Sequence, residues 1–106
     1  MEGDALRGHL ELLLLAALAR AEQHGYALIE WLRARSDGAL DLGEGSVYPA
    51  LRRLEAAGYV SSSWRVDGGR RKRVYRLTKR GEKRLRDGRE EWDALARTVD
   101  LVLEAS

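Results

Sequence analysis

The residues of this sequence best suited to chemistry are cations, and the chemistry that they suit is the binding of a polyanion. Residues 65–86 hold eleven lysine or arginine residues against two acids, a net charge of +9. The flanking segments are acidic, with net charges of −3 over residues 1–64 and −4 over residues 87–106. Crowded cations repel one another unless an anion lies beside them. Such a block is a footprint for nucleic acid, with a solvated charged surface as the alternative.

A second set of polar residues lies in "LGEGSVYPALRRLEAAGYV", residues 42–60. The spacing predicts a helix with aliphatic residues on one face and short polar, aromatic and arginine side chains on the other. Arginine can bind guanine through two hydrogen bonds or pair with phosphate, so this outer face can enter a major groove. With the densest part of the basic block, the predicted DNA contacts are Ser46, Tyr48, Pro49, Arg52, Arg53, Arg70, Arg71, Lys72 and Arg73.

Several of these residues also have a plainer interpretation. Tyr48 could brace the loop before the helix, and Arg52 and Arg53 could be surface charges paired with Glu55 or Glu30. We favour DNA contact for Tyr48 and Arg52 because they lie one helical turn apart and project together. For Arg53 the two interpretations are evenly matched.

The aromatic residues near the basic block can be interpreted either as packing residues or as parts of the binding surface. Arg71 and Arg73 share a strand face with Trp64, where a cation–π contact can form, although Trp64 itself is expected to pack. Tyr26 is expected in the core rather than at a phosphate. The further cations of residues 79–86 are expected to be mostly solvated.

The composition excludes several classes of site. There is no cysteine, so disulfides and thiolate metal sites are excluded. His9 and His24 are too few and too far apart for a metal site, and are expected to be hydrogen-bonded structural residues; no metal or cofactor is expected. No nucleophile–base pair or phosphate-cradling glycine loop is present, so we do not expect an enzyme. The longest apolar run, residues 12–19, is shorter than the ~20 residues of a membrane span, and with no basic leader the chain is expected in the cytoplasm.

Three helices are expected to position the outer face. Periodic apolar residues predict helices over residues 5–20 and about 26–35, and a loop rich in glycine and aspartate leads to the third. We expect Ser46 to cap the third helix, Pro49 to fall in its first turn and Gly58 to follow its end. Its inward face consists of Val47, Ala50, Leu51 and Leu54.

The segment after the third helix reads as a β-hairpin with a basic tip. The apolar period changes to 2, and "YVSSSWRV" and "RKRVYRL" flank "DGG". A turn at Asp67-Gly68 or at Gly68-Gly69 places the same residues on each face. The residues expected to tie the base of the hairpin to the helices are Val60, Trp64, Tyr75 and Leu77.

A last helix is expected from a cap at Thr78 to about Glu104. Apolar residues recur seven apart, the pattern of paired helices, although Gly81 and Gly88 weaken the helix locally. We expect this helix to pair with a second copy through Leu85, Trp92, Leu95, Val99, Val102 and Leu103. Trp92 is either an anchor of that interface or a wall of an effector cavity between subunits.

Three short helices, a hairpin with a cationic tip and a long helix form the order of a winged helix-turn-helix, a mainly α fold with a small β-hairpin. The chain resembles the PadR family of transcriptional regulators in "HGYALIE" (24–30), "LGEGSVYPALRRLEAAGYV" (42–60) and "RVYRLTKRG" (73–81). Ser46 and Val47 stand where threonine and leucine are commoner in that family.

The resemblance implies a winged helix-turn-helix DNA-binding domain, residues 1–78, and a C-terminal dimerisation helix, residues 79–106. It implies a homodimer, closed by the last helix and by Leu6 and Leu10 of the first, that represses genes from a palindromic operator in double-stranded DNA. It also implies a response to a small effector, often aromatic, or to an interaction at the dimer region. The alternative is a winged-helix module that contacts proteins without DNA, which has no need of the +9 block.

Overall fold

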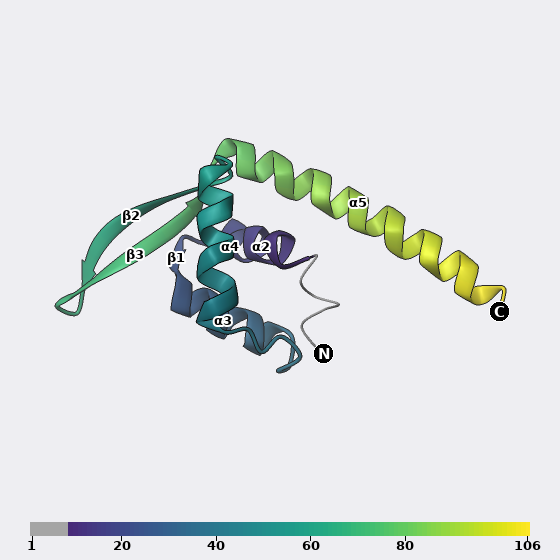
Figure 1. The fold of residues 1–106 in the computed structure, drawn as a ribbon, viewed down its shortest axis with the longest axis horizontal. Helices are drawn as coiled ribbons and strands as arrows, with labels where there is room; N and C mark the ends of the chain where they lie inside the picture. Colours follow the sequence, from purple (N-terminus) through teal and green to yellow (C-terminus); the bar gives the residue numbers. More distant parts are fainter. Residues whose placement is uncertain (1–8) are drawn as a thin grey trace.

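The structure is a computed structural model that describes residues 9–106 of the chain. Figure 1 shows short helices grouped at the centre, a β-ribbon reaching out on one side and a long helix on the other. This arrangement confirms the predicted mainly α winged helix-turn-helix followed by a long helix. In chain order the elements are α2 (Leu10–Arg20), β1 (Gln23–His24), α3 (Gly25–Arg35), α4 (Glu44–Ala56), β2 (Val60–Asp67), β3 (Arg70–Leu77) and α5 (Lys79–Glu104).

The core lies where α2, α3 and α4 meet and where the base of the ribbon covers them. Leu14, Leu28 and Leu51 are fully buried there. Burial of a leucine side chain contributes about 1.5–3 kcal/mol relative to leaving it exposed, so these three side chains are strong anchors of the core. The inward face predicted for the third helix is confirmed, because α4 buries Val47, Ala50, Leu51 and Leu54.

The start of α4 differs from the prediction. The N-cap residue is Gly43, whose carbonyl accepts hydrogen bonds from the backbone N–H groups of Ser46 and Val47 (both 3.1 Å). Ser46 is therefore the third residue of the helix and not its cap, and Pro49 lies inside the helix beyond the first turn. Pro49 has no N–H for the carbonyl of Gly45, but Gly45 is exposed, so water can reach that carbonyl. Glu44 stabilises the early start through the helix dipole.

The end of α4 agrees with the prediction. Gly58 follows the cap residue Ala57 and adopts a left-handed conformation, with a φ of 83°. The N–H of Tyr59 donates to the carbonyl of Leu54, and the N–H of Gly58 donates to that of Glu55, both at 3.0 Å. These two bonds form a Schellman motif, which turns the chain sharply from α4 into β2.

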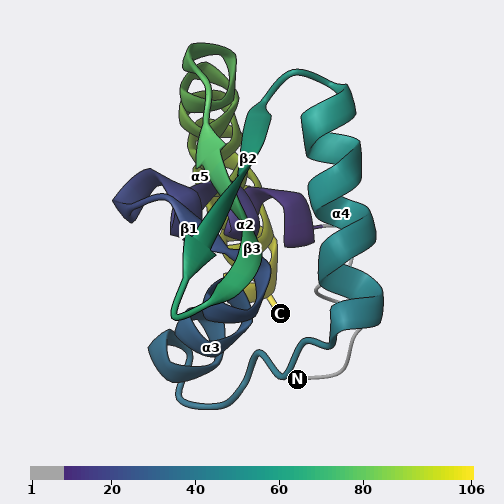
Figure 2. The same cartoon turned by 90° about the vertical axis from the view of Figure 1, so that its left-hand side faces the viewer.

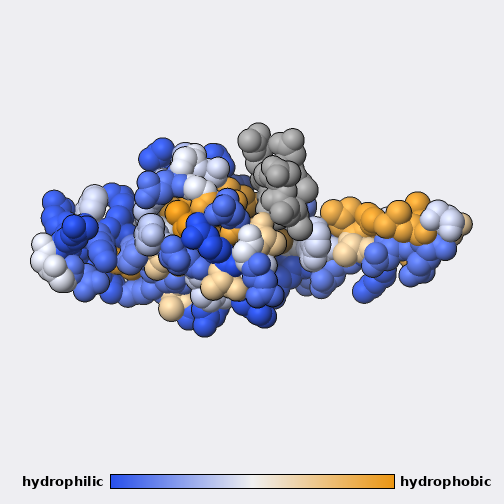
Figure 3. All heavy atoms as spheres, turned by 90° about the horizontal axis from the view of Figure 1, so that it is seen from below, coloured by the Kyte–Doolittle hydropathy of each residue, from blue (hydrophilic) through white to orange (hydrophobic). Residues whose placement is uncertain are grey.

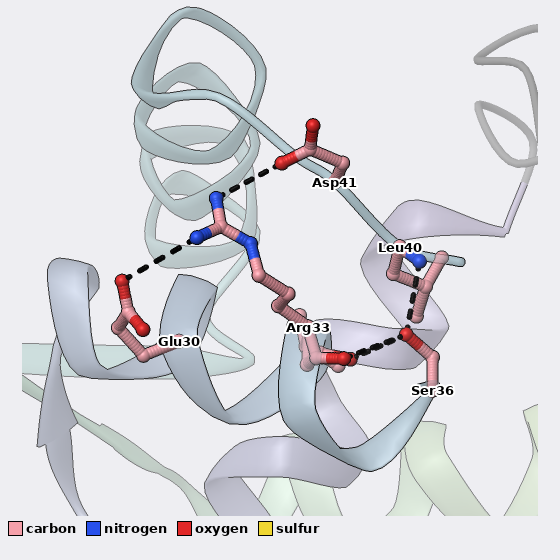
Figure 4. Close-up of polar contacts among 6 residues, drawn as sticks. Glu30, Arg33, Ser36, Leu40 and Asp41 are labelled. Atoms are coloured by element: carbon pink, nitrogen blue, oxygen red, sulfur yellow. Dashed lines mark hydrogen bonds and ion pairs between the residues drawn. The ribbon is translucent and has the colours of Figure 1, made fainter. Parts of the chain in front are cut away.

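The connection from α3 to α4 is held by polar contacts that Figure 4 shows. Arg33 pairs with Asp41 at 2.9 Å and with Glu30 at 3.8 Å. The hydroxyl of Ser36 donates to the carbonyl of Leu32 (2.7 Å) and accepts from the N–H of Leu40 (2.9 Å). This short loop is therefore ordered by its own side chains, and it sets the direction in which α4 begins.

The sheet is antiparallel with strand order β1-β3-β2. The turn between β2 and β3 is Gly68-Gly69, with φ values of 58° and 78°, which suit a two-residue hairpin. Trp64 lies opposite Arg73 in the register, so the predicted strand faces are confirmed. The two-residue strand β1, which pairs with β3, was not predicted because two residues are too short to show a period. We call β2, β3 and their turn, residues 60–77, the wing.

Helix α5 begins as predicted at a Thr78 cap, whose hydroxyl oxygen accepts from the N–H of Gly81 (3.0 Å). Gly81 and Gly88 are both buried and lie where other parts of the chain approach α5 closely. A Cβ on Gly88 would lie 2.7 Å from Cδ1 of Leu12 in α2. The two glycines expected to weaken the helix are thus places where it packs against the domain, and the C-terminal part of α5 extends away from the other helices (Figure 1).

Two findings concern whole classes of site. Among residues 9–106 no helix combines the length and the apolar character required to cross a membrane. Within the same part of the chain, no three histidine, cysteine or acidic side chains gather as metal ligands do.

Candidate nucleic-acid interface

The start of α4 and the wing border one hollow of ≈ 620 Å³. Figure 2 shows α4 standing beside the β2–β3 ribbon, with α3 at the foot of both. The hollow therefore joins residues far apart in the sequence into one surface that is both aromatic and cationic. Its lining residues are His24, Tyr26, Tyr48, Trp64, Arg70, Arg71, Lys72, Arg73 and Tyr75.

Tyr48 has a structural role as well as a place in this hollow. Its ring lies on the first residue of α3, where a Cβ on Gly25 would come within 2.5 Å of the ring. Burial, and secondarily the charge of Glu44, raise the pKa of the Tyr48 phenol above its ordinary value. The hydroxyl therefore stays protonated at neutral pH and can donate a hydrogen bond to an anion.

The two arginines of α4 point in different directions. Arg53 is paired with Glu11 of α2, with Nε 3.6 Å from the carboxylate oxygen. Arg52 is exposed and makes no ion pair with any residue in the described part of the chain. Of the pairings considered from the sequence, Glu30 and Glu55 are instead bound to Arg33 and Arg73 respectively. The helix thus leaves Arg52 available one turn beyond Tyr48, whereas Arg53 is held against α2.

The remaining predicted contacts of α4 lie in its early turns. Ser46 is exposed and Pro49 is half-buried. Because Ser46 is inside the helix and not at its cap, its hydroxyl is not used to cap α4. It is thereby left on the outer surface, close to the end of the helix where the positive dipole lies.

The wing presents its cations around an exposed indole. Trp64 is 54% exposed, so the prediction that it packs against the helices is wrong. The predicted cation–π contacts are confirmed, since the guanidinium carbons of Arg71 and Arg73 lie 4.7 and 5.3 Å from the centroid of the Trp64 ring. Helices cover only the base of the wing, which is anchored by Val60, Tyr75 and Leu77.

Arg70, Lys72 and Arg73 of the wing have different surroundings. Arg70 is exposed beside the Gly68-Gly69 turn. Lys72 lies 3.7 Å from Asp67 across the hairpin, an exposed pair of little energetic weight. Arg73 is turned toward the base of the wing, where it lies 3.7 Å from Glu55 of α4.

Four residues that line the hollow were not among the predicted DNA contacts, namely His24, Tyr26, Trp64 and Tyr75. Tyr26 was expected in the core, but it is 55% exposed at the start of α3 and lines the hollow. His24 caps α3, because its Nδ1 accepts from the N–H of Ala27 (3.2 Å), which confirms a hydrogen-bonded structural role. The sequence could have indicated a place in the site for Tyr26 and His24, because both lie at the start of the helix that precedes the predicted DNA-facing helix.

The residues predicted for a dimer interface fall into three groups. Leu6 lies outside the described residues. Leu10 and Leu85 are buried in the core of the chain itself, because α2 packs on the first turns of α5. The others are 44–69% exposed and form an apolar stripe on the free part of α5, visible in Figure 3. This α5 stripe consists of Trp92, Leu95, Val99, Val102 and Leu103.

Trp92 lies at the inner end of the α5 stripe, where the helix leaves the domain. Its ring meets the His9 imidazole edge to face, with the centroids 5.0 Å apart and the planes at 76°. The side chain of His9 makes this contact and does not cap α2. Trp92 therefore connects the folded domain with the exposed part of α5.

Known proteins share both the sequence and the fold of this chain. Residues 14–87 match the family described as "Transcriptional regulator PadR-like family". The transcriptional regulator Rv3488 of Mycobacterium tuberculosis is 39% identical over 93 residues, 88% of this chain and 84% of that protein. A PadR family transcriptional regulator from Eggerthella lenta superposes with a TM-score of 0.85 at 33% identity, covering 97% and 88% of the two chains. A transcriptional regulator from Clostridium thermocellum superposes with a TM-score of 0.86 at 28% identity, covering 92% and 96%.

Proposed function

This chain belongs to the PadR-like family of transcriptional regulators, and from that premise we propose that it is a repressor that binds a palindromic operator as a homodimer. Members of this family are transcriptional regulators, so the chain is a regulator and not an enzyme. The observation that carries the proposal is the shared hollow, which Tyr48 of α4 borders together with Trp64, Arg71 and Arg73 on one face of the wing. Its partner, chromosomal DNA, would place the chain in the cytoplasm.

The proposal assigns α4 to the major groove. Ser46, Tyr48 and Pro49 occupy its early turns, which lie nearest the base edges when such a helix enters a groove. Arg52 follows one turn later with an exposed guanidinium that has no ion pair among residues 9–106, which suits guanine or phosphate. Arg53, paired with Glu11, lies at the edge of this surface and reaches a phosphate only by leaving that pair.

The wing is assigned to the sugar–phosphate backbone. Arg70, Arg71 and Lys72 carry positive charge along its outer end and are the phosphate contacts, whereas Arg73 extends the basic run toward α4 and is paired there with Glu55. Contacts of this kind position a protein on the duplex without reading its sequence. His24 and Tyr26, at the start of α3, border the same hollow, so a phosphate bound there would lie near the positive end of that helix.

The homodimer is proposed through the α5 stripe. Five large apolar side chains on one helical face are more than an isolated surface helix usually exposes, and a two-fold axis would bury each stripe against its copy. Residues 1–78 then form the DNA-binding part and residues 79–106 the dimerisation helix. Because the first turns of α5 pack on α2, the helix is free for pairing only beyond Gly88.

A small aromatic effector is proposed to bind beside Trp92 and to release the DNA. The half-exposed indole lies where α5 leaves the domain, so a ligand stacked on it would touch both the dimer and the DNA-binding part. Titration of the dimer with aromatic acids, followed by tryptophan fluorescence in wild type and in Trp92→Phe, tests this. Quenching that persists in Trp92→Phe would reject the site.

The DNA-binding proposal is tested by gel shift on the duplex upstream of the chain's own gene, with a random duplex of equal length beside it. Binding to the upstream duplex that falls steeply with salt supports a repressor, with a log–log slope of about −0.9 per phosphate neutralised. No retention of either duplex in dilute buffer would reject DNA binding and favour a winged-helix module for protein contact.

A further inference from the structure

Arg73 carries a wing cation, yet its guanidinium is bound to neighbouring elements of the same chain. Its Nε donates to the hydroxyl oxygen of Ser62 at 2.8 Å, and a terminal nitrogen lies 3.7 Å from a carboxylate oxygen of Glu55. The hydroxyl of Ser62 in turn donates to the other carboxylate oxygen of Glu55 at 2.6 Å. Ser62 is in β2, Arg73 in β3 and Glu55 in α4, so one small network joins all three elements. We call Glu55, Ser62 and Arg73 the wing clamp.

We propose that the wing clamp fixes the angle between the wing and α4, and that Arg73 serves DNA binding as a positioning residue and not as a phosphate contact. This inference rests on the proposed function. Both the wing and α4 must meet one duplex at the same time, so an error in their relative angle separates one of them from its groove. A network that joins them fixes that angle before the DNA arrives.

The position of the clamp along the wing explains why it is needed. Toward the base, Val60 and Tyr75 are buried against the helices. Toward the tip, Trp64 and Val66 are 54% and 74% exposed, and a two-stranded ribbon by itself is only marginally stable in water. The clamp lies at the boundary of these regions, because in the register Ser62 is opposite Tyr75 and Arg73 is opposite Trp64.

The opposite face of the wing has its own tether. Arg65 pairs with Glu22, the residue that precedes β1. That pair ties the wing to the segment before α3, whereas the clamp ties it to α4. The two contacts act on opposite strand faces, so together they restrict the ribbon from tilting either way.

Two interpretations of Glu55 predict opposite changes in DNA affinity when its negative charge is removed. The plainer interpretation is that the clamp is an ordinary surface ion pair, which contributes about 0–1 kcal/mol and has no effect on the wing. On that interpretation, removal of Glu55 should tighten DNA binding, because a negative charge near the DNA is lost and Arg73 is released. If the clamp positions the wing, removal of the same acid weakens DNA binding.

The first experiment removes no charge. Ser62→Ala eliminates both clamp hydrogen bonds, and Ser63→Ala is the matched control on the other face of the same strand. On the duplex upstream of the chain's own gene, Ser62→Ala is expected to bind about fivefold more weakly than wild type, the effect of losing a net hydrogen-bond contribution. Its salt slope should be unchanged because no phosphate contact is lost. Equal affinities of the two serine variants would overturn the proposal.

The second experiment uses the direction of the change in DNA affinity. Glu55→Gln is expected to weaken binding to the same duplex despite the loss of a negative charge, and Arg73→Lys is expected to weaken it with the charge retained. Tighter binding by Glu55→Gln would overturn the proposal. Wild-type affinity in Arg73→Lys would do so as well, because a lysine keeps the charge but has neither the Nε–H donor nor the planar group that faces Trp64.

A measurement without DNA separates this inference from the proposed function. Amide hydrogen exchange over residues 60–77 of the DNA-free protein should be faster in Ser62→Ala than in Ser63→Ala, by about fivefold at the outer end of the wing. If the wild type ignores DNA while this difference is present, the DNA-binding function fails and the clamp stands as a wing brace. Equal exchange in both variants would overturn the clamp whatever the DNA result.

Discussion

Gly81 of α5 lies against the backbone carbonyl of Tyr59, so closely that a methyl group added to Gly81 would overlap the oxygen. The same carbonyl accepts a hydrogen bond from the N–H of Thr78 at 3.1 Å, so it cannot withdraw without losing that bond. The contact joins the turn after α4 to the first turn of the long helix. A residue that seems to weaken a helix in the sequence is therefore the one that lets the helix dock.

The first prediction concerns this contact. Gly81→Ala gains about 1 kcal/mol of helix propensity but forces a backbone shift, and overpacking costs about 1–3 kcal/mol or more when backbone must move. We expect a net loss of stability, measured by urea unfolding. Gly88→Ala is the matched control, because the atom it would meet is the end of the flexible, half-buried Leu12 side chain. Equal effects of the two variants would contradict this account.

The second prediction separates the cations of α4 from those of the wing. Arg52→Ala should lose about 1–3 kcal/mol of discrimination between the upstream and random duplexes, because its exposed guanidinium is assigned to the groove. Arg70→Ala should weaken both duplexes alike and reduce the salt slope by about 0.9. Arg53→Ala should do less than Arg52→Ala, since Arg53 is paired with Glu11. Gel shifts at three salt concentrations measure all of these, and a larger effect at Arg53 would refute the assignment.

The third prediction divides the two roles of Tyr48. Tyr48→Phe keeps the ring against Gly25 and should fold with wild-type stability, but bind DNA more weakly because the hydroxyl donor is lost. Tyr48→Ala should lose stability as well, by about 3 kcal/mol or less, since the ring is only half-buried. Thermal unfolding and gel shift on both variants distinguish the roles. If Tyr48→Phe binds like wild type, the hydroxyl has no part in DNA contact.

The pH dependence of Tyr48 follows from the direction of its shift. A phenol whose pKa is raised in the folded state favours the protonated form there, so its contribution to stability is present below the ordinary value of 10.0 and is lost as pH rises above it. Between pH 6 and 9 the difference in DNA affinity between wild type and Tyr48→Phe should be constant. A difference that disappears within this range would mean that the phenol ionises there.

The fourth prediction concerns the α5 stripe. Val99→Glu places a charge at the centre of the stripe and should convert the dimer to a monomer in sedimentation equilibrium, because an unpaired charge is costly to bury. Arg97→Glu is the control, since position 97 lies on the far side of the helix and the change should leave the dimer intact. The domain core should keep its stability in both variants. A wild-type chain that sediments as a monomer at high concentration would remove the stripe from the proposed interface.

Much of the fold was predictable because it depends on neighbours in the chain. The glycine turn and a period of 2 determined which residues share each face of the wing. The sequence left the turn at either Asp67-Gly68 or Gly68-Gly69, so the structure decided that Trp64 lies opposite Arg73. Spacing within a helix determined that Val47 and Leu51 face inward, and a threonine before a polar run predicted the cap of α5. In each case a few consecutive dihedral angles decide the outcome, so local residue types suffice.

The features that the sequence left open depend on which faces of the helices and strands pack against one another. The spacing that placed Leu10 and Leu85 on apolar faces could not show that these faces cover each other within one chain. It placed Trp64 on the face of Val60 but could not show that the helices end before reaching it, and it counted Arg73 as a free cation although Glu55 and Ser62 bind it. Periodicity determines the side of an element on which a residue lies, whereas burial and pairing are decided by segments distant in sequence, which only the packed tertiary structure brings together.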